Sequence, residues 1–266
     1  MVHLSFRDSR DERVIYGVFS DVHSNMEALE AVLGFFEDFE VGGYICCGDL
    51  VGYGPEPNAV LDRIRGLKNA HVICGNHDLA VIGRLEVEWF NSYARAAALW
   101  TRERLSDDSR AYLESLTAKL DCPEFTLAHG TPRRPPEEYL LSAAQFRDNV
   151  EYVKQWPLFV GHSHMPLCFR AAPEAKGGVE SIFLEHNQVV ETARVAPGGA
   201  LAPTAYNPGS VGQPRDHDNR AACALFDSEA QTFRIVRLTY DVAATQSKIR
   251  AAGLPEFLAL RLAFGQ

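Results

Sequence analysis

Strand-like apolar runs alternate with helical periodicity over the first 160 residues, and this alternation constrains the fold most. Residues 13–20 form a β-branched and aromatic run of the kind found in buried strands. Asn25 then stands as a plausible N-cap, and apolar residues recur at helical spacing over 26–36. The same pairing returns with a strand at 44–47 and a helix through 60–64. Alternating strands and helices predict an α/β sheet that is parallel at least in this half.

The alternation continues beyond residue 70. The pattern predicts a strand at 71–74 and two helices within 89–119, with a break at 106–109 whose Ser and Asp residues would cap the second helix. Further elements are a strand at 124–128, a Pro-rich loop at 132–136, a helix over about 142–155 and a strand at 158–160.

Strand-like runs dominate after residue 165, at 181–184, 189–195, 221–226 and 233–238, with glycine pairs at 177–178 and 198–199 marking turns. This change predicts a second, more antiparallel sheet, and the tail 241–266 is predicted to be helical. Because 266 residues are near the limit of one hydrophobic core, we expect a single domain over 1–266, flexible at 1–12.

Composition excludes some classes of function. The net charge of -9 argues against a general nucleic-acid-binding surface, so any phosphate that the protein handles needs a local positive centre such as a metal ion. The six cysteines lack the spacing of a secreted disulfide scaffold. No signal peptide or membrane-spanning apolar stretch is evident. The sequence therefore predicts a cytoplasmic protein without membrane contact.

Polar side chains follow the predicted strands at the point where each strand ends. Ligands bind outside the carboxyl ends of the strands in open α/β sheets. Each motif alone is typical of a turn or of a helix cap. Together they supply the carboxylate, imidazole and amide groups that suit Mn, Fe, Zn or Mg ions. The motifs are Asp21-Val-His23, Gly48-Asp49-Leu-Val-Gly52, Gly75-Asn76-His77-Asp78, His129-Gly130 and Gly161-His162-Ser-His164.

These motifs, in this order, resemble those of the calcineurin-like metallophosphoesterase superfamily, and residues 207–215 extend the similarity to its small bacterial and archaeal phosphodiesterase-like branch. The resemblance implies a four-layer α/β/β/α sandwich of two mixed β-sheets flanked by helices. It also implies two divalent metal ions, of which Mn and Fe fit best and Zn, Ni, Co or Mg are alternatives. Carried over, the ligands are Asp21, His23 and His164 for one ion, Asn76, His129 and His162 for the other, and Asp49 as the bridge between them.

The chemistry that this implies is hydrolysis of phosphate esters. Two cations roughly 3.5 to 4 Å apart can hold a bridging hydroxide at neutral pH and neutralise charge during an in-line displacement. His77, beside a ligand but not expected to be one, would protonate the leaving oxygen or stabilise the transition state.

For other polar residues near the motifs, the sequence leaves alternative roles open. Asp78 either orients the His77 ring or caps a helix, and Asn25 either contacts phosphate, holds the first metal loop or acts as an N-cap. Arg215 either binds a phosphate oxygen bidentately or forms a surface salt bridge. Asn207 and Ser210 are expected to shape the turn before Arg215.

The second motif narrows the class of substrates that we expect. Ser/Thr phosphatases and dinucleoside polyphosphate hydrolases of the superfamily typically have Gly-Asp-x-x-x-Arg-Gly, whereas this chain has Asp49-Leu-Val-Gly-Tyr-Gly54. We therefore expect a phosphodiesterase acting on a small phosphodiester or nucleotide. A phosphomonoesterase, including those two activities, is the alternative, since Arg133, Arg134 or Arg215 could supply charge. A non-catalytic metal-binding regulatory subunit would not need His77.

Overall fold

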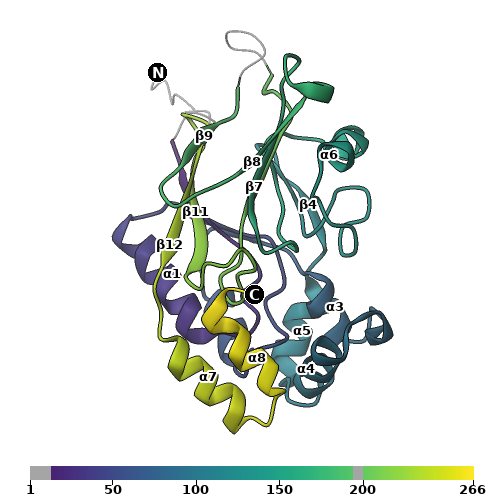
Figure 1. The fold of residues 1–266 in the computed structure, drawn as a ribbon, viewed down its shortest axis with the longest axis vertical. Coiled ribbons are helices and arrows are strands. Elements are labelled where there is room, and N and C mark those ends of the chain that lie inside the picture. The colour runs from purple at the N-terminus through teal and green to yellow at the C-terminus, as the bar shows by residue number, and fades with distance from the viewer. Residues whose placement is uncertain (1–12, 194–199) are drawn as a thin grey trace, which may run out of the picture.

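The computed structural model describes residues 13–193 and 200–266 as two six-stranded sheets with helices around them (Figure 1). The segment predicted to be flexible, 1–12, and the glycine turn at 198–199 lie outside the described residues. In the first sheet β1, β2 and β3 are parallel, whereas β11, β12 and β9 are antiparallel to their neighbours. Its strands, in spatial order, are β3 (Ala70–Val72), β2 (Gly43–Cys46), β1 (Ile15–Phe19), β11 (Ala221–Asp227), β12 (Thr232–Leu238) and β9 (Val189–Glu191).

The second sheet is also mixed. Its central strands β5, β6 and β10 are parallel, and β4, β7 and β8 pair antiparallel at the two sides. The spatial order is β4 (Lys119–Asp121), β5 (Thr126–Ala128), β6 (Leu158–Phe159), β10 (Thr204–Pro208), β7 (Pro166–Ala171) and β8 (Val179–Phe183).

The predicted division into an early parallel sheet and a late antiparallel sheet is wrong. Each sheet instead combines early and late strands and contains both parallel and antiparallel pairs. The strand β11 explains why, because all of its residues are buried and it therefore needs a central position, which it takes beside β1. The pattern of apolar residues indicates that a strand is buried on both faces but does not indicate its partner. The strand β10 was missed because Asn and Pro, which are depleted in strands, occupy its end.

The helices begin and end close to the predicted positions. The side chain of Asn25 caps the first helix, and the side chain of Ser106 caps the second helix of the 89–119 region, as predicted. The helix predicted over 142–155 is shorter, ending at Asn149 and continuing as a 3-10 turn to Tyr152. The helices are α1 (Met26–Asp38), α2 (Pro57–Arg65), α3 (Asn76–Val81), α4 (Ser92–Arg102), α5 (Asp107–Ser115), α6 (Ala143–Asn149), α7 (Val242–Ala251) and α8 (Glu256–Leu260), with further 3-10 turns at Val87–Trp89, Lys176–Gly178 and Arg261–Phe264.

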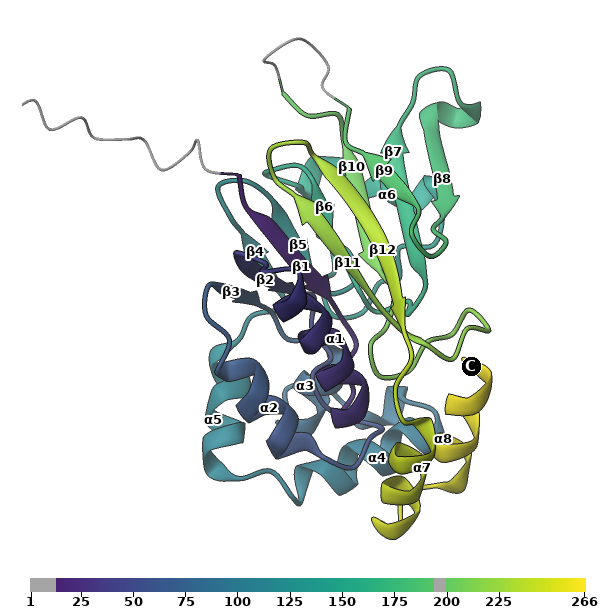
Figure 2. The same cartoon turned by 90° about the vertical axis from the view of Figure 1, so that its left-hand side faces the viewer.

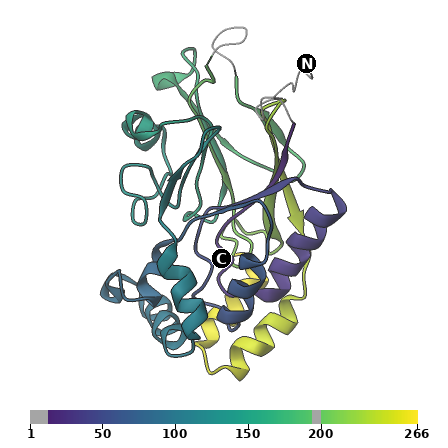
Figure 3. The same cartoon turned by 180° about the vertical axis from the view of Figure 1, so that it is seen from behind.

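Four layers result from the way apolar faces are covered. Helices α1 and α2 pack on the outer face of the first sheet, and α6 packs on the outer face of the second (Figures 2 and 3). Between the sheets, aromatic side chains meet, and the ring of Tyr206 on β10 stacks on that of Phe233 on β12 at 4.4 Å between centroids. This is the α/β/β/α sandwich that the resemblance implied. Within the described ranges, no helix is long and apolar enough to cross a membrane.

Candidate metal centre

The seven residues predicted as metal ligands lie together in the structure. They come from loops that follow β1, β2, β3, β5 and β6, so strands of both sheets contribute to one cluster. Six of the seven side chains are buried, and only Asn76 is partly exposed. Because most of the cluster is shielded from water, its donors interact with one another more strongly than they would at the surface.

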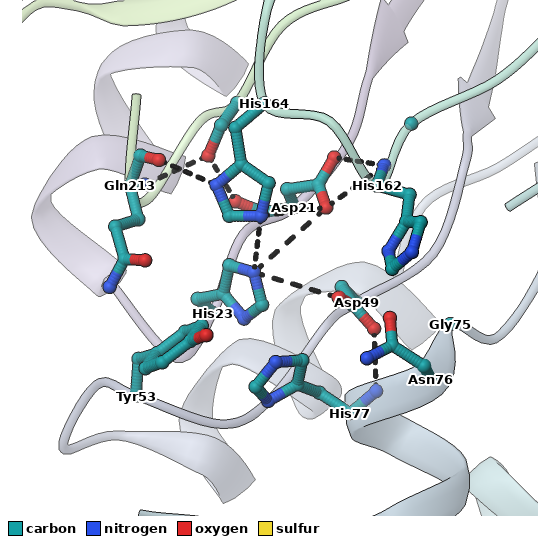
Figure 4. A network of polar contacts seen from close by, with 12 residues as sticks. Asp21, His23, Asp49, Tyr53, Gly75, Asn76, His77, His162, His164 and Gln213 are labelled. Carbon is teal, nitrogen blue, oxygen red and sulfur yellow. Dashed lines mark hydrogen bonds and ion pairs between the residues drawn. The ribbon is translucent and has the colours of Figure 1, made fainter. Parts of the chain in front are cut away.

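One half of the cluster surrounds the His164 ring (Figure 4). The Nε2 atom of His164 lies 3.2 Å from Nε2 of His23 and 3.2 Å from Oδ1 of Asp21. Nε2 of His23 is in turn 3.7 Å from Oδ2 of Asp49. One ligand atom from each of these four residues lies within 4.8 Å of the others, close enough for a single ion to bind all four.

The other half of the cluster surrounds the His129 ring. Nε2 of His129 lies 3.0 Å from Oδ1 of Asn76 and 3.4 Å from Oδ2 of Asp49. Ligand atoms of His162, His129 and Asp49 again lie within 4.8 Å of one another. Asp49 therefore belongs to both halves, which is the position that a bridging carboxylate requires.

Backbone carbonyls orient three of the four imidazoles. In each, Nδ1 lies at hydrogen-bond distance from a carbonyl oxygen, so the proton sits on Nδ1 and the lone pair of Nε2 faces the cluster. Such outer hydrogen bonds fix the tautomer of metal-binding histidines. The pairs are His23 with Val51 O at 3.1 Å, His129 with Cys47 O at 2.8 Å and His164 with Gln213 O at 2.6 Å.

The fourth imidazole shows that the donors fit a metal ion. Nε2 of His162 is buried and has no hydrogen-bond partner among the described residues. A buried polar atom without a partner costs about 1–3 kcal/mol. A bound ion would satisfy this nitrogen, and imidazole with carboxylate is a donor set that divalent transition metals accept.

Burial and mutual charge set the protonation of the cluster. Burial raises the pKa of Asp21 to about 7, and the neighbouring Asp49 adds to the effect. Burial also acts to raise the pKa of Asp49, but the charges of His129 and His77 outweigh it and hold that pKa well below its usual range. Burial lowers the pKa values of the remaining imidazoles, those of His23, His162 and His164. Neutral imidazole is the form that binds metal.

Glycines in the motifs make room for the ligands. A Cβ atom on Gly75 would lie 2.0 Å from Oδ1 of Asp49, and one on Gly161 would lie 2.8 Å from Oδ2 of Asp21. Gly75 has an extended backbone with a φ of -106°, which any residue can adopt. Space for the carboxylate, rather than backbone freedom, therefore requires glycine at position 75.

Five of the predicted ligands have a left-handed backbone, which L-residues rarely adopt. Such a conformation costs on the order of 1–3 kcal/mol per residue and clusters at functional sites. The surrounding structure must therefore hold these loops firmly. The φ values are 54° at Asp21, 50° at His23, 53° at Asp49, 65° at His162 and 60° at His164.

The segment 207–213 holds two of these loops together. Nδ2 of Asn207 donates to Gly161 O at 2.6 Å, and the Ser210 hydroxyl donates to Asp21 O at 2.8 Å. The same two side chains also accept from backbone N–H groups of their own turn, as predicted. They thus link the loop after β1 to the loop after β6.

His77 lies beside both halves of the cluster. Its backbone N–H donates to Oδ1 of Asp49 at 2.9 Å, and its ring centroid is 4.9 Å from that of His23 (Figure 4). Nδ1 of His77 is buried and has no partner in the part of the chain that the structure describes. The ring is therefore close to the centre, and its Nδ1 lies against Gly52 without a hydrogen bond to a described residue.

The hydrogen bonds of Asp78 and Asn25 favour a structural role for both side chains. The Asp78 carboxylate accepts from the backbone N–H groups of Gly75, Leu50 and Val51 at 2.9, 3.1 and 3.0 Å, and no bond to the His77 ring is seen within the described ranges. Asn25 caps α1, donates to Gly212 O at 3.0 Å and accepts from the Thr245 hydroxyl at 3.1 Å. These contacts occupy both side chains in holding loops, so neither Asp78 as a catalytic residue nor Asn25 as a phosphate ligand is supported.

In residues 13–193 and 200–266, Arg215 forms no surface salt bridge, its alternative role. Among the described residues no carboxylate lies within 4.0 Å of it, and its contacts are with the Tyr53 hydroxyl at 3.3 Å and Oε1 of Gln213 at 3.2 Å. Arg133 and Arg134, the other candidate cations, are paired with Glu138 and Glu137. Of these three arginines, Arg215 is the one without an acidic partner.

Two aromatic residues at the site were not predicted. The Tyr53 ring lies 4.7 Å from the His23 ring, and the Tyr139 ring stacks on His162 at 3.8 Å between centroids. Tyr53 directly follows Gly52 of the second motif, so its position there was a usable signal. Tyr139 lies outside every motif, so no signal in the sequence pointed to its position at the site.

Comparison with known proteins identifies the family. A family model of the calcineurin-like phosphoesterase superfamily domain matches residues 15–231. The chain belongs to this superfamily. An uncharacterized protein from Methanocaldococcus jannaschii is 34% identical over 256 residues, which cover 94% of this chain and 97% of that protein.

Two solved structures are similar over nearly the whole chain. A metallophosphoesterase from Sphaerobacter thermophilus has a TM-score of 0.84 and 38% identity, covering 96% of this chain and 100% of its own. A hypothetical protein from Pyrococcus horikoshii shares the fold, with a TM-score of 0.74, 22% identity and coverage of 95% and 99%. The predicted family, fold and enzyme class are thus confirmed, and this superfamily member is a metal-dependent phosphoesterase with buried Asp and His clusters that could bind metal ions.

The close approach of Gly75 to Asp49 gives a first prediction. In Gly75→Ala the added methyl must displace the Asp49 carboxylate, so we expect fewer bound metal ions per chain and a lower melting temperature. The measurements are metal content by elemental analysis and thermal unfolding of the same sample. Gly34→Ala is the control, because nothing lies within 4 Å of a Cβ atom added at Gly34. Alanine stabilises the interior of a helix by roughly 0.5–1 kcal/mol relative to glycine, so this variant should not unfold at a lower temperature. Unchanged metal content in Gly75→Ala would contradict this role for the glycine.

Proposed function

We propose that the protein is a dinuclear-metal phosphodiesterase acting on a small phosphodiester or nucleotide. The observation that supports this best is the buried cluster of seven donors in two halves that share Asp49. In this proposal Asp49 contacts both ions, which are Mn²⁺ or Fe²⁺, since mixed oxygen and nitrogen donors suit these metals. The other ligands are Asp21, His23 and His164 for one ion and Asn76, His129 and His162 for the second.

When bound, two divalent ions would polarise the phosphate, lower the pKa of a water molecule and neutralise charge on the attacking and leaving oxygens. The chain supplies the closed, preorganised setting for this chemistry. The carbonyls behind the imidazoles and the glycines beside the carboxylates hold the donors in place before substrate arrives. Preorganised donors do not have to reorient during the reaction.

His77 is the proposed catalytic side chain. It is not one of the seven donors, yet its ring lies 4.9 Å from the His23 ring and 4.4 Å from the Tyr53 ring. The His77 ring, whose buried Nδ1 has no hydrogen-bond partner among the described residues, can act on the substrate either by passing a proton to the leaving group or by stabilising charge in the transition state. A merely structural histidine would be expected to have this buried nitrogen paired.

The preference for diesters rests on Tyr53. In the Gly-Asp-x-x-x-Arg-Gly pattern the arginine stands four residues after the aspartate, and here Tyr53 occupies that position after Asp49. A phenol brings no positive charge to the substrate phosphate. A diester has one negative charge on its phosphate whereas a monoester has up to two, so the loss of a guanidinium at this position disfavours the monoester.

A phosphomonoesterase is the second candidate, and Arg215 is the observation that favours it. Its guanidinium contacts the Tyr53 hydroxyl, so a positive charge approaches the same position from another loop. An arginine without an acidic partner can bind phosphate oxygens bidentately. The relative rates on diester and monoester substrates decide between the two candidates.

The proposed function predicts faster cleavage of a diester than of a monoester. With Mn²⁺ present, kcat/KM for bis-p-nitrophenyl phosphate should exceed that for p-nitrophenyl phosphate, measured by release of p-nitrophenolate at one pH. The reverse order would establish the phosphomonoesterase. Failure to cleave either compound with Mn²⁺, Fe²⁺, Zn²⁺, Ni²⁺, Co²⁺ or Mg²⁺ would show that the enzyme assignment does not extend to simple aryl esters and would sink the proposal.

The role of His77 predicts a separation between metal binding and activity. His77→Asn should keep two ions per chain and lose roughly 10²- to 10⁴-fold in kcat, the usual contribution of a positioned acid or base. His186→Asn, at an exposed histidine outside the cluster, is the matched control and should keep full activity. If His77→Asn lost its metal ions together with its activity, His77 would be a structural support of the centre.

A further inference from the structure

Two arginines approach the same ring beside the proposed metal centre. The guanidinium carbon of Arg215 is 5.9 Å from the centroid of Tyr53, and that of Arg261 is 6.0 Å from it. The Tyr53 ring itself lies 4.7 Å from His23 and 4.4 Å from His77 (Figure 4). The Tyr53 ring therefore lies close both to the arginine pair and to residues of the candidate metal centre. Arg261 comes from the C-terminal segment, which carries none of the motifs.

Hydrogen bonds hold the C-terminal segment against the loop that carries Arg215. The His217 N–H donates to Gly265 O at 2.9 Å, and Nδ2 of Asn219 donates to Ala263 O at 3.3 Å. A Cβ on Gly265 would lie 2.6 Å from the carbonyl oxygen of Asp218, so the two segments are in close backbone contact. The C-terminal helices lie at the same end of the sheets as the metal loops (Figures 1 and 2). The position of Arg261 is thus fixed by the fold.

Neither arginine is paired with an Asp or Glu side chain among the residues that the structure describes. Arg261 donates from Nε to the carbonyl of Gln266, and Nε of Arg215 is buried without any hydrogen bond. Arginines nearby differ in this respect. They are paired with carboxylates, Arg220 with Asp218, Arg237 with Asp216 and Arg250 with Glu256.

The pair carries unbalanced positive charge. Burial and, after it, the positive charge of Arg215 together lower the pKa of Arg261 to about 10. Two half-buried like charges without a directly paired Asp or Glu side chain are unfavourable, because desolvation and repulsion act in the same direction. An anion between or beside the two guanidinium groups would relieve both effects.

We propose that Arg215 and Arg261 bind a second phosphate group of the substrate, one that is not hydrolysed, while the scissile ester lies at the metal centre. The planar donor fork of arginine matches phosphate oxygens bidentately, so two guanidinium groups that are not paired with Asp or Glu side chains suit a phosphate group. The inference rests on the proposed function and narrows its substrate class to phosphodiesters that carry a further phosphate, such as a nucleotide in which one phosphate is a diester and a second phosphate is a monoester.

A pair of substrates that differ by one phosphate tests the inference. They are thymidine 5′-(p-nitrophenyl phosphate) and the same compound phosphorylated on the 3′ hydroxyl. The wild-type protein with Mn²⁺ should show a kcat/KM roughly tenfold or more higher for the phosphorylated compound, mostly through KM, as expected for charge-assisted hydrogen bonds. In Arg261→Met the preference should disappear, and Arg261→Lys, which keeps the charge but loses the fork, should restore part of it.

Arg250→Gln is the matched control. It also removes one positive charge from the C-terminal segment, but from an arginine that is already paired with Glu256. It should keep the preference of the wild-type protein. Thermal unfolding of each variant shows whether it is folded. If Arg261→Met does not fold, the comparison of Arg261→Lys with Arg250→Gln decides, and a preference equal in both would overturn the proposal.

A binding measurement separates this inference from the proposed function. Isothermal titration of thymidine 3′,5′-bisphosphate into metal-free protein requires no turnover and no ion. Binding should be at least tenfold weaker in Arg261→Met than in the wild-type protein and in Arg250→Gln. Such a result supports the phosphate site even if neither ester is cleaved. Equal binding by all three proteins, or the absence of binding by the wild-type protein, would overturn the inference.

Discussion

The carboxylate of Asp49 is the contact on which the rest of the site depends. One oxygen accepts the backbone N–H of His77, which fixes the start of α3, and the other lies 3.4 Å from His129 and 3.7 Å from His23. Burial acts to lower the pKa of His129, but the negative charges of Asp49 and Asp21 raise it. The space that it occupies is the space that Gly75 leaves free. Both halves of the candidate metal centre therefore meet at one side chain.

The sheets explain how such a concentration of polar groups is kept in place. Asp21, Asp49 and the His162–His164 loop have left-handed backbones directly after strands that are anchored in the two-sheet core. Asn207 and Ser210 then join loops that belong to different sheets. A strained loop persists only where its surroundings over-determine it. The inter-sheet packing is thus the support for the chemistry at the strand ends.

Local patterns in the sequence predicted most helices and many strands, and the resemblance of the motifs to a known superfamily implied the four-layer fold and the set of candidate ligands. Strand ends and helix caps such as Asn25 and Ser106 are visible within a few residues, and the motifs follow the strands. Features that arise from tertiary pairing were not predictable. The insertion of β11 beside β1 depends on partners more than 200 residues apart, and Arg261 reaches Tyr53 only because the tail folds back on the loop at 217–219. The choice between the roles of Asp78 and Asn25 likewise required their actual hydrogen-bond partners.

The central claim is that the cluster around Asp49 holds two metal ions, and anomalous diffraction from Mn²⁺-soaked crystals tests it most directly. The account predicts two anomalous peaks per chain. One should lie among Asp21, His23, Asp49 and His164, and the other among Asp49, Asn76, His129 and His162. A single peak, or two peaks of which only one contacts Asp49, would contradict it.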